Sequence, residues 1–307
     1  MTTIAVQPAK KRRKKRQDLV FPIVNTIILI ALMYITLFPV LNTVAISFNE
    51  GVDAARGGIG LWPRKFATEA YSTILSDNDV YQAAFISASK TVIITLLNLF
   101  WTGMLAYALS RREYVLRKFI TMVMVLTMYV NAGLIPNYLL IMNTMNLGGK
   151  YWVYIIPTMF SCFNMIVIRT YIAGLPDALV ESARLDGAGD IRIYWQIIFP
   201  LCTPVLATVA LFVAVGSWNS WFDTHLYCGQ NTSLHTLQYL LKMKLDTAGA
   251  SANKAKATVD SLVQTAEPSP VTIRCAITVI STVPILVVYP FLQKYFVTGM
   301  ALGSVKE

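Results

Sequence analysis

The chain has 307 residues, of which 55% are hydrophobic and 14% are charged, and its formal net charge is +10. Soluble domains are about 25% charged, and apolar runs of about 18 residues recur along this chain, so the composition excludes an ordinary soluble enzyme or binding domain. We therefore expect an integral membrane protein built from α-helices.

The first predicted element is a basic tail, residues 1–20, which contains the cluster Lys10 to Arg16. Because this cluster directly precedes the first apolar run, we interpret it as an anchor at anionic lipid headgroups and not as a nucleic-acid binding site. The apolar run is too long for the core of a cleaved signal peptide, and no small-residue cleavage site follows it, so we expect it to be retained. Residues 21–307 then form one transmembrane domain.

Six apolar runs follow one another, each long enough for a helix to cross about 30 Å of hydrocarbon. The predicted fold class is therefore an all-α integral membrane protein with six transmembrane helices. The expected spans are about 21–46, 86–109, 119–141, 151–173, 201–222 and 272–293.

Lys and Arg are unevenly distributed between the two sides of these spans. One side has 16 of the 26 basic residues, in the tail, in the loop Arg111 to Lys118, in the connection 174–200 and its flank, and near the C-terminus. Basic residues are enriched in cytoplasmic connections, so this side is predicted to be cytoplasmic. Both termini and the connection 174–200 are then expected in the cytoplasm.

Two long segments are expected on the outer side. The first, about 47–85, contains Trp62 and Phe66, which suit a membrane interface. The second, 223–271, has leucines at helical spacing from Leu234 onward. Two interpretations of the second segment stay open, namely a flexible loop and an ordered helical element that contacts an external partner.

The connection between the fourth and fifth spans is polar and has signals for two short helices. Pro176 suits the first turn of a helix, and Gly187 suits its C-terminal end because glycine tolerates left-handed backbone. Asp190 is expected to cap a second, amphipathic helix that lies along the headgroups. Pro200 is expected to move Phe199 out of the helical region and to bend the chain there.

The spacing of this connection resembles the E-A-A, three residues, G, nine residues, I-x-L-P motif of ATP-binding-cassette (ABC) importer permeases. The matching residues are Glu181-Ser182-Ala183, Gly187, and Ile197 to Pro200, with Ser182 and Phe199 departing from the motif. Gly60-Leu61-Trp62-Pro63, Ser217 to Asp223 and Tyr289 to Lys306 resemble the carbohydrate (oligosaccharide and polysaccharide) uptake branch, similar to the smaller maltose-importer permease.

The resemblance implies a type I ABC importer permease fold in which residues 174–200 carry a cytoplasmic coupling helix. Glu181 would pair with a basic residue of an ATPase, Ala183 would allow its close approach, and Gly187 would shape the turn. The whole expected coupling set is Glu181, Ser182, Ala183, Asp186, Gly187, Ile197 and Pro200.

The same resemblance implies the partners and the setting of the chain. They are a second homologous permease, a cytoplasmic ATPase dimer and an external sugar-binding protein, in the plasma (inner) membrane of a bacterium. No G-x-x-x-x-G-K-[ST] phosphate loop occurs in the chain, so ATP and Mg²⁺ are expected on the ATPase, and the chain itself is expected to have no cofactor and no enzymatic activity.

Polar and aromatic residues at membrane depth are candidates for the sugar pathway, because they are costly in lipid without a partner. For the tryptophans, anchoring at the membrane interface is an alternative role, and for Asn131 a hydrogen bond between helices is another. Gly133 and Pro136 could loosen the third span. The candidates are Asn131, Asn137, Trp218, Asn219 and Trp221.

The remaining features of the sequence indicate no additional catalytic or metal-binding site. Lys90 lies near the outer end of the second expected span, where its ammonium is expected to snorkel. The four cysteines lack metal spacing and are expected to be small apolar residues, and no motif of a membrane hydrolase occurs. A secondary transporter or channel for a small polar solute is the alternative function, although no acidic residue lies clearly inside a span.

Overall fold

The computed structural model describes residues 17–130, 132–255 and 269–304, so the basic cluster Lys10 to Arg16 and Asn131 lie outside the described residues. Within the described residues the chain is helical, and the only β-type pairing there is an isolated bridge between Asn49 and Phe66. This secondary structure confirms the all-α fold class.

The α-helices are joined by short turns and by several 3₁₀ and π segments. The 3₁₀ turns cover Tyr151–Val153, Ile156–Thr158 and Thr232–Leu234, and the π turns cover Leu140–Thr144 and Tyr194–Ile198. The α-helices are α1 (Gln17–Ser47), α2 (Gly51–Ala55), α3 (Glu69–Leu75), α4 (Asn78–Ser110), α5 (Arg117–Tyr129), α6 (Leu134–Leu139), α7 (Cys162–Ile172), α8 (Ala178–Leu185), α9 (Asp190–Ile193), α10 (Phe199–Leu201), α11 (Thr203–Asn219), α12 (Phe222–Tyr227), α13 (Leu237–Ala255) and α14 (Pro270–Ser304).

Among the described residues, three helices are individually long and apolar enough to cross a membrane. They lie in α1 over Phe21–Ser47, in α4 over its whole length, and in α14 over Pro270–Pro290. Three further candidates are bent pairs, so that the number of spans reaches six if each pair counts as one. The second span was expected from residue 86, and its helix begins eight residues earlier, at Asn78.

The third expected span, 119–141, is not one helix. α5 ends at Tyr129, and the next helix begins after Gly133, which has φ +86° and ψ 178°, a conformation that only glycine adopts readily. The segments before and after this break are inclined by 113°. The expected loosening is therefore a complete interruption of the helix.

The fifth span also departs from the expectation. Phe199 stays helical, at φ −58° and ψ −47°, and the chain leaves helical geometry at Cys202 instead, where α10 and α11 meet at a bend of 79°. The preceding π turn, Tyr194–Ile198, supplies the physical reason. Its wider winding leaves room for the ring of Pro200, which would otherwise clash with a carbonyl of the preceding turn.

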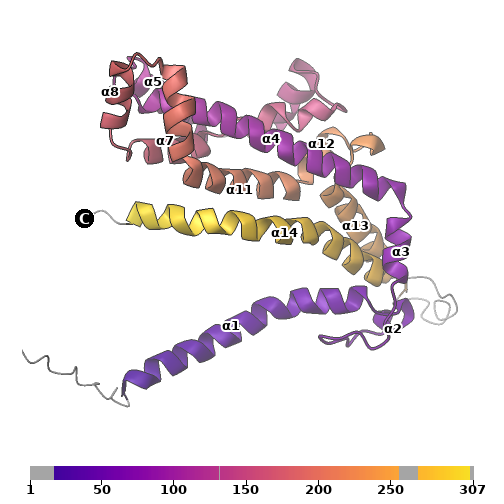
Figure 1. Ribbon diagram of the computed structural model, residues 1–307. Helices are drawn as coiled ribbons and strands as arrows, with labels where there is room; N and C mark the ends of the chain where they lie inside the picture. The colour runs from indigo at the N-terminus through magenta and orange to yellow at the C-terminus, as the bar shows by residue number, and fades with distance from the viewer. Residues whose placement is uncertain (1–16, 131, 256–268, 305–307) are drawn as a thin grey trace, which may run out of the picture.

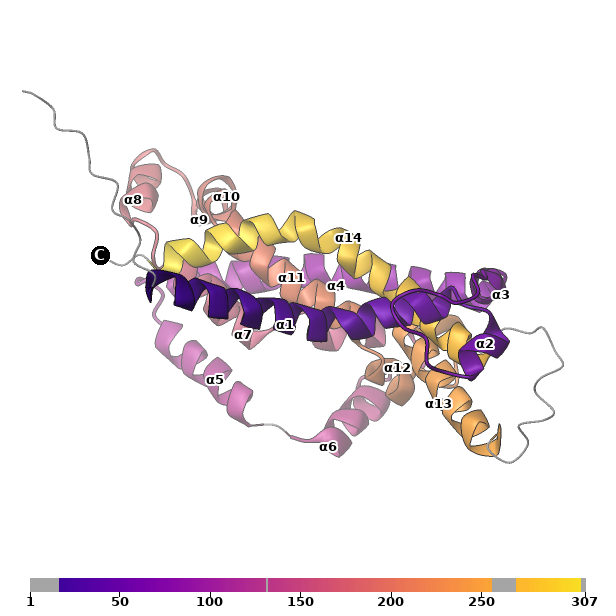
Figure 2. The ribbon, with the colours of Figure 1, turned by 90° about the horizontal axis from the view of Figure 1, so that it is seen from below.

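The core lies where α4 packs against α7 and α11, while α1 and α14 lie side by side on the other side of α11 (Figure 1). Figures 1 and 2 both place the start of α1, the end of α14 and helix α8 at one end of the molecule. α2, α3 and α13 lie at the opposite end. The bundle therefore has two chemically different ends, here called the α8 end and the α13 end.

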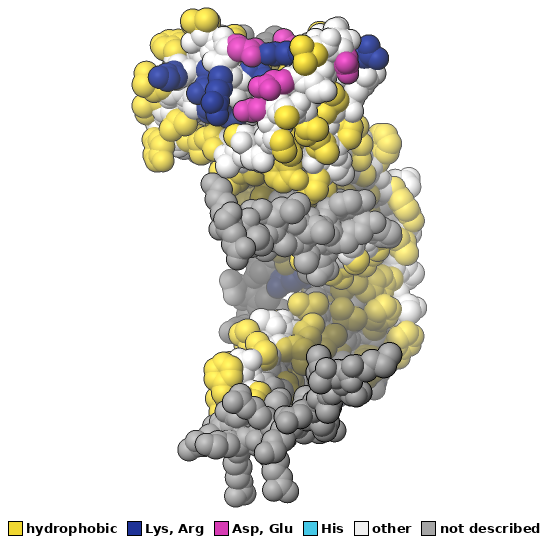
Figure 3. Space-filling view, turned by 60° about the vertical axis from the view of Figure 1, so that its left-hand side comes forward, with side chains coloured by type: hydrophobic (Ala, Val, Ile, Leu, Met, Phe, Trp, Pro, Cys, Tyr) yellow, Lys and Arg dark blue, Asp and Glu magenta, His cyan; other side chains and the backbone are white. Residues whose placement is uncertain are grey.

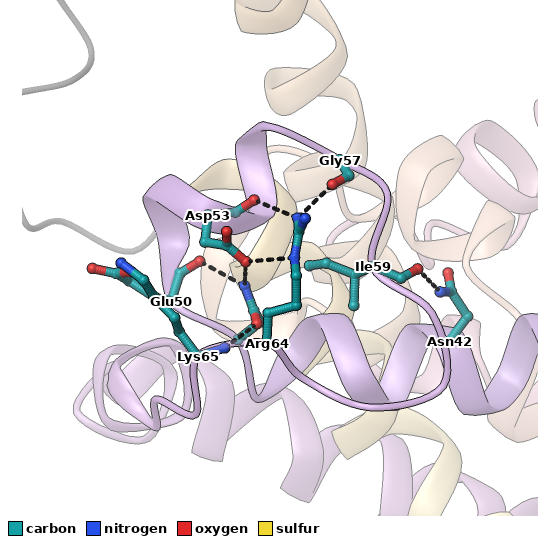
Figure 4. A network of polar contacts seen from close by, with 8 residues as sticks. Asn42, Glu50, Asp53, Gly57, Ile59, Arg64 and Lys65 are labelled. Carbon is teal, nitrogen blue, oxygen red and sulfur yellow. Dashed lines mark hydrogen bonds and ion pairs between the residues drawn. The ribbon is translucent and has the colours of Figure 1, made fainter.

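At the α13 end, the segment between α1 and α3 is fastened by side chains. Asp53 accepts hydrogen bonds from the Asn49 amide, at 2.9 Å, and from Nε of Arg64, at 3.1 Å (Figure 4). The Asn49 bond is the main reason why the pKa of Asp53 lies below its usual value. Arg64 also donates to the carbonyl of Gly57, and Lys65 pairs with Glu50. These contacts make the segment a folded cap.

The second outer segment is also largely folded. It contains α12, a 3₁₀ turn and α13, with Leu237 buried against α3 and α14. Residues 223–255 are therefore ordered and helical, and the contact of this segment with an external partner stays a prediction. Residues 256–268 lie outside the described part of the chain.

Candidate functional site

The connection 174–200 begins with α8, whose C-terminal end has the geometry expected from the sequence. Gly187 has φ +79°, and its N–H donates to the carbonyl of Arg184. The N–H of Ala188 donates to the carbonyl of Ala183 at 2.9 Å. These two bonds form a Schellman motif, which pairs carbonyls that the helix itself leaves free. Glycine is therefore required at position 187 by the backbone alone.

One face of α8 is open to its surroundings. Glu181, Ser182, Asp186 and Gly187 are all exposed, and beside them Leu185 is 89% exposed. Ile191 of α9 adds a second apolar side chain, 74% exposed. Leu185 and Ile191 are therefore apolar side chains left uncovered beside the acidic ones.

The opposite face of α8 is buried in the bundle. Ala183 is 8% exposed and packs with Val180 in the apolar cluster formed with α4, α7 and α11. The expected role of Ala183 in the close approach of a partner stays a prediction. A small residue at this position lets α8 approach its own membrane helices.

Arg184 connects three parts of the α8 end. Its guanidinium pairs with Glu113, in the turn between α4 and α5, and at 3.1 Å with Asp190 at the start of α9. The hydrogen bond from Arg184 lowers the pKa of Glu113 below its ordinary value. The expected cap at Asp190 is also corrected, since α9 is preceded by Gly189 and no side chain caps it. Asp190 pairs with Arg184 of α8 instead.

The second half of the connection is held by Tyr194, which is 4% exposed. A Cβ atom built at Gly103 of α4 would lie 2.6 Å from the Tyr194 hydroxyl, so only glycine lets the ring approach this closely. The Tyr194 ring also packs against Tyr107, with ring centroids 5.4 Å apart. Of the motif residues further on, Ile197 is half-buried and Pro200 is exposed.

Between these contacts lies an open cavity of about 370 Å³, bounded by α4, the turn after it, α8 and α9. Figure 3 shows Lys, Arg, Asp and Glu side chains gathered over this end of the molecule, with hydrophobic side chains below them. The α8 end therefore combines a charged rim, exposed apolar side chains and a hollow. Such a combination suits contact with a water-soluble protein.

The described candidates for the sugar pathway contact different elements, and their role in that pathway stays a prediction. Asn137 is exposed on α6, and Asn131 lies outside the described residues. The Trp218 indole donates to the carbonyl of Ser281 in α14 at 3.0 Å, whereas Trp221 lies under Lys242 of α13. Asn219 donates to a carbonyl of its own helix.

A different set of polar residues meets inside the bundle. A cavity of about 310 Å³ lies between α4, α7, α11 and the segment that contains Tyr154. Its wall contains Lys90 and Asn98 from α4, Asn164 from α7, and Asp223 after α11. Lys90, Asn98 and Asn164 are 1%, 1% and 6% exposed, respectively.

Lys90 is the clearest correction to the sequence analysis. Its ammonium does not snorkel but donates to the carbonyl of Ser220 at 3.2 Å, and it lies 5.0 Å from the centre of the Tyr154 ring. Ser220 follows the last residue of α11, where a helix end attracts positive charge. Asp223, at the start of α12, lies in the wall of the same cavity.

The described residues contain no group of His, Cys, Asp and Glu side chains that could hold a metal ion. All four cysteines are free. Cys202 and Cys228 are buried, and burial raises the pKa of the Cys228 thiol. They are small apolar residues, as expected.

The chain is similar to known transport proteins over almost its full length. Residues 99–239 match the family described as "Binding-protein-dependent transport system inner membrane component". "Protein LplC" of Bacillus subtilis is 36% identical over 287 residues, which cover 94% of this chain and 95% of that protein. The "Polygalacturonan/rhamnogalacturonan transport system permease protein YtcP" of the same organism is 33% identical, with 89% and 93% covered.

A solved structure has the same fold. It is described as a bacterial ABC transporter involved in the import of the acidic polysaccharide alginate. The similarity has a TM-score of 0.82 at 29% sequence identity and covers 93% of this chain and 100% of the other.

Proposed function

This chain belongs to the family of binding-protein-dependent transport system inner membrane components, and we propose that a separate ATPase drives it through the surface formed by α8 and α9. The chain is a permease subunit of a carbohydrate ABC importer and not itself an enzyme. The alternative of a secondary transporter or channel has no support among these similarities.

The observation that carries the proposal is the division of α8 into two faces. Ala183 and Val180 fasten the helix to the membrane bundle, while Glu181 and Leu185 stay uncovered. A force applied to the exposed face is then passed to α4 and α11 through buried side chains. Glu181 is the acidic residue of the exposed face that we assign to a basic group of the ATPase.

The remaining partners follow from the family. We propose a second homologous permease in the membrane and a sugar-binding protein at the α13 end, with ATP and Mg²⁺ bound by the ATPase dimer. The α8 end then faces the cytoplasm, together with both chain termini. Relatives named for polygalacturonan, rhamnogalacturonan and arabino-oligosaccharides favour an oligosaccharide released from a polysaccharide as the substrate.

Co-purification tests the coupling surface. Glu181→Arg places a cation where the ATPase is expected to present one, and buried or half-buried like charges at an interface cost several kcal/mol. We expect untagged ATPase to be lost from the tagged permease complex. Glu69→Arg makes the same change on α3 at the α13 end and should retain it. If Glu181→Arg also retains the ATPase at wild-type stoichiometry, the proposed surface is wrong.

A further inference from the structure

The polar cavity beside Lys90 is lined by charged and amide groups that helix packing alone does not require. Its wall combines an ammonium from Lys90, a carboxylate from Asp223 and amides from Asn98 and Asn164. Groups of this kind are costly inside a protein unless they bind one another or a ligand. The question is how many of their hydrogen bonds the protein itself supplies.

Within the described residues, the protein supplies only part of them. Asn164 donates to Oδ1 of Asn98 at 3.1 Å, and the Asn98 amide donates to the carbonyl of Thr158 at 3.3 Å. Lys90 can donate three hydrogen bonds, and the described residues provide one acceptor, the carbonyl of Ser220. The Asp223 carboxylate accepts one bond, from the Ser220 hydroxyl. Among the described residues, the Lys90 ammonium therefore has donors to spare and the Asp223 carboxylate has acceptor positions to spare.

We infer that this cavity is a subsite for one saccharide unit of the transported oligosaccharide, which binds through its hydroxyl groups; the inference rests on the proposed function. A hydroxyl both donates and accepts, so neighbouring hydroxyls can satisfy Lys90 and Asp223 together. The two opposite charges balance each other, which favours a polyol over a free anion or cation. The volume of about 310 Å³ lies within the range of small-molecule sites.

Gly216 provides a test that leaves the polar groups untouched. It lines the cavity from α11, and a Cβ atom built there meets no other atom within 4 Å. Gly216→Leu therefore occupies free space, and leucine is the better helix former. We expect it to lower oligosaccharide uptake per ATP hydrolysed roughly 10-fold or more, because the leucine side chain fills part of the volume that the saccharide unit would occupy. Gly216→Ala, the matched control, should stay close to wild type.

The charged pair provides a second test. Lys90→Met and Asp223→Asn should each raise the KM for uptake by about 10-fold or more, because hydrogen bonds to charged groups are the stronger ones. The double variant separates the two possible roles of the pair. If the charges serve only to neutralise each other, the double variant recovers the wild-type KM. If they bind sugar, it does not recover.

Uptake should be measured in proteoliposomes with the complete transporter, using radiolabelled arabino-oligosaccharides and oligogalacturonides of two to four units. Lys150→Met is the control for a lysine that also donates to a backbone carbonyl but lies exposed in a turn. Unchanged ATPase co-purification in every cavity variant keeps this test separate from that of the coupling surface. Wild-type uptake per ATP hydrolysed in Gly216→Leu, or recovery of the wild-type KM in the double variant, overturns the inference. A larger loss for oligogalacturonides in Lys90→Met indicates that the ammonium also binds their carboxylates.

Discussion

At the scale of single residues, Gly103 is the position whose replacement should be most informative. Its missing side chain gives room to the Tyr194 hydroxyl, and Tyr194 is itself buried. Gly103→Ala should destabilise the α8 end by about 1–3 kcal/mol, the usual cost of overpacking, despite the better helix propensity of alanine. Thermal unfolding of the detergent-solubilised transporter measures it. Gly189→Ala, where a Cβ meets no atom, is the control.

Single residues also show where the sequence was insufficient. The spacing of Glu181, Ser182, Ala183 and Gly187 identified the family, because a contiguous motif is visible in one dimension. Lys90 was misjudged because its acceptor, Ser220, lies 130 residues further along the chain. Asn98 and Asn164 were missed for the same reason, although an asparagine inside an apolar run is a signal that could have identified both.

At the scale of elements, the prediction that depended on the backbone of one residue was correct, and two predictions that left out contacts with nearby residues were wrong. The Gly187 turn was predictable because left-handed backbone is a local requirement. The cap at Asp190 was wrong because Arg184 competes for the same carboxylate. The bend at Phe199 was wrong, since Phe199 stays helical after the π turn and the chain bends at Cys202 instead.

Arg184 is the element-scale test, since it holds α8, α9 and the turn after α4 together. Arg184→Gln should loosen the connection without unfolding the bundle, because exposed ion pairs contribute little to global stability. We expect roughly two- to five-fold faster amide hydrogen exchange over residues 178–193. Arg192→Gln, which removes a guanidinium bonded only to Gln196 among the described residues, is the control. Equal exchange in both variants would contradict the bridging role.

The bridge also has a defined pH dependence. Arg184 lowers the folded-state pKa of Glu113, so its contribution is fully present above the ordinary carboxyl value of 4.5. It is lost as the pH falls through the lowered folded value. The difference in exchange between wild type and Arg184→Gln should therefore persist at neutral pH and disappear in acid.

At the scale of the whole molecule, two independent observations assign α8, the start of α1 and the end of α14 to the same end of the bundle. Lys and Arg gather on one side of the predicted spans, and Figures 1 and 2 place α8 with the start of α1 and the end of α14. The sequence predicted six segments that could each cross the membrane. It could not show that α5 and α6 are separate helices. That interruption depends on Gly133, whose conformation no periodicity reveals.

The orientation of the bundle in the membrane is the last prediction. In a variant without Cys162, Cys202, Cys228 and Cys275, a single cysteine replaces either Leu185, which is 89% exposed on α8, or Glu69, which is exposed on α3. A charged maleimide cannot cross lipid, so it labels only the side from which it is added. We expect Glu69→Cys to react in intact cells and Leu185→Cys to react only in inside-out vesicles. The opposite pattern would place α8 outside the cell, away from any cytoplasmic ATPase, and would contradict the coupling proposal.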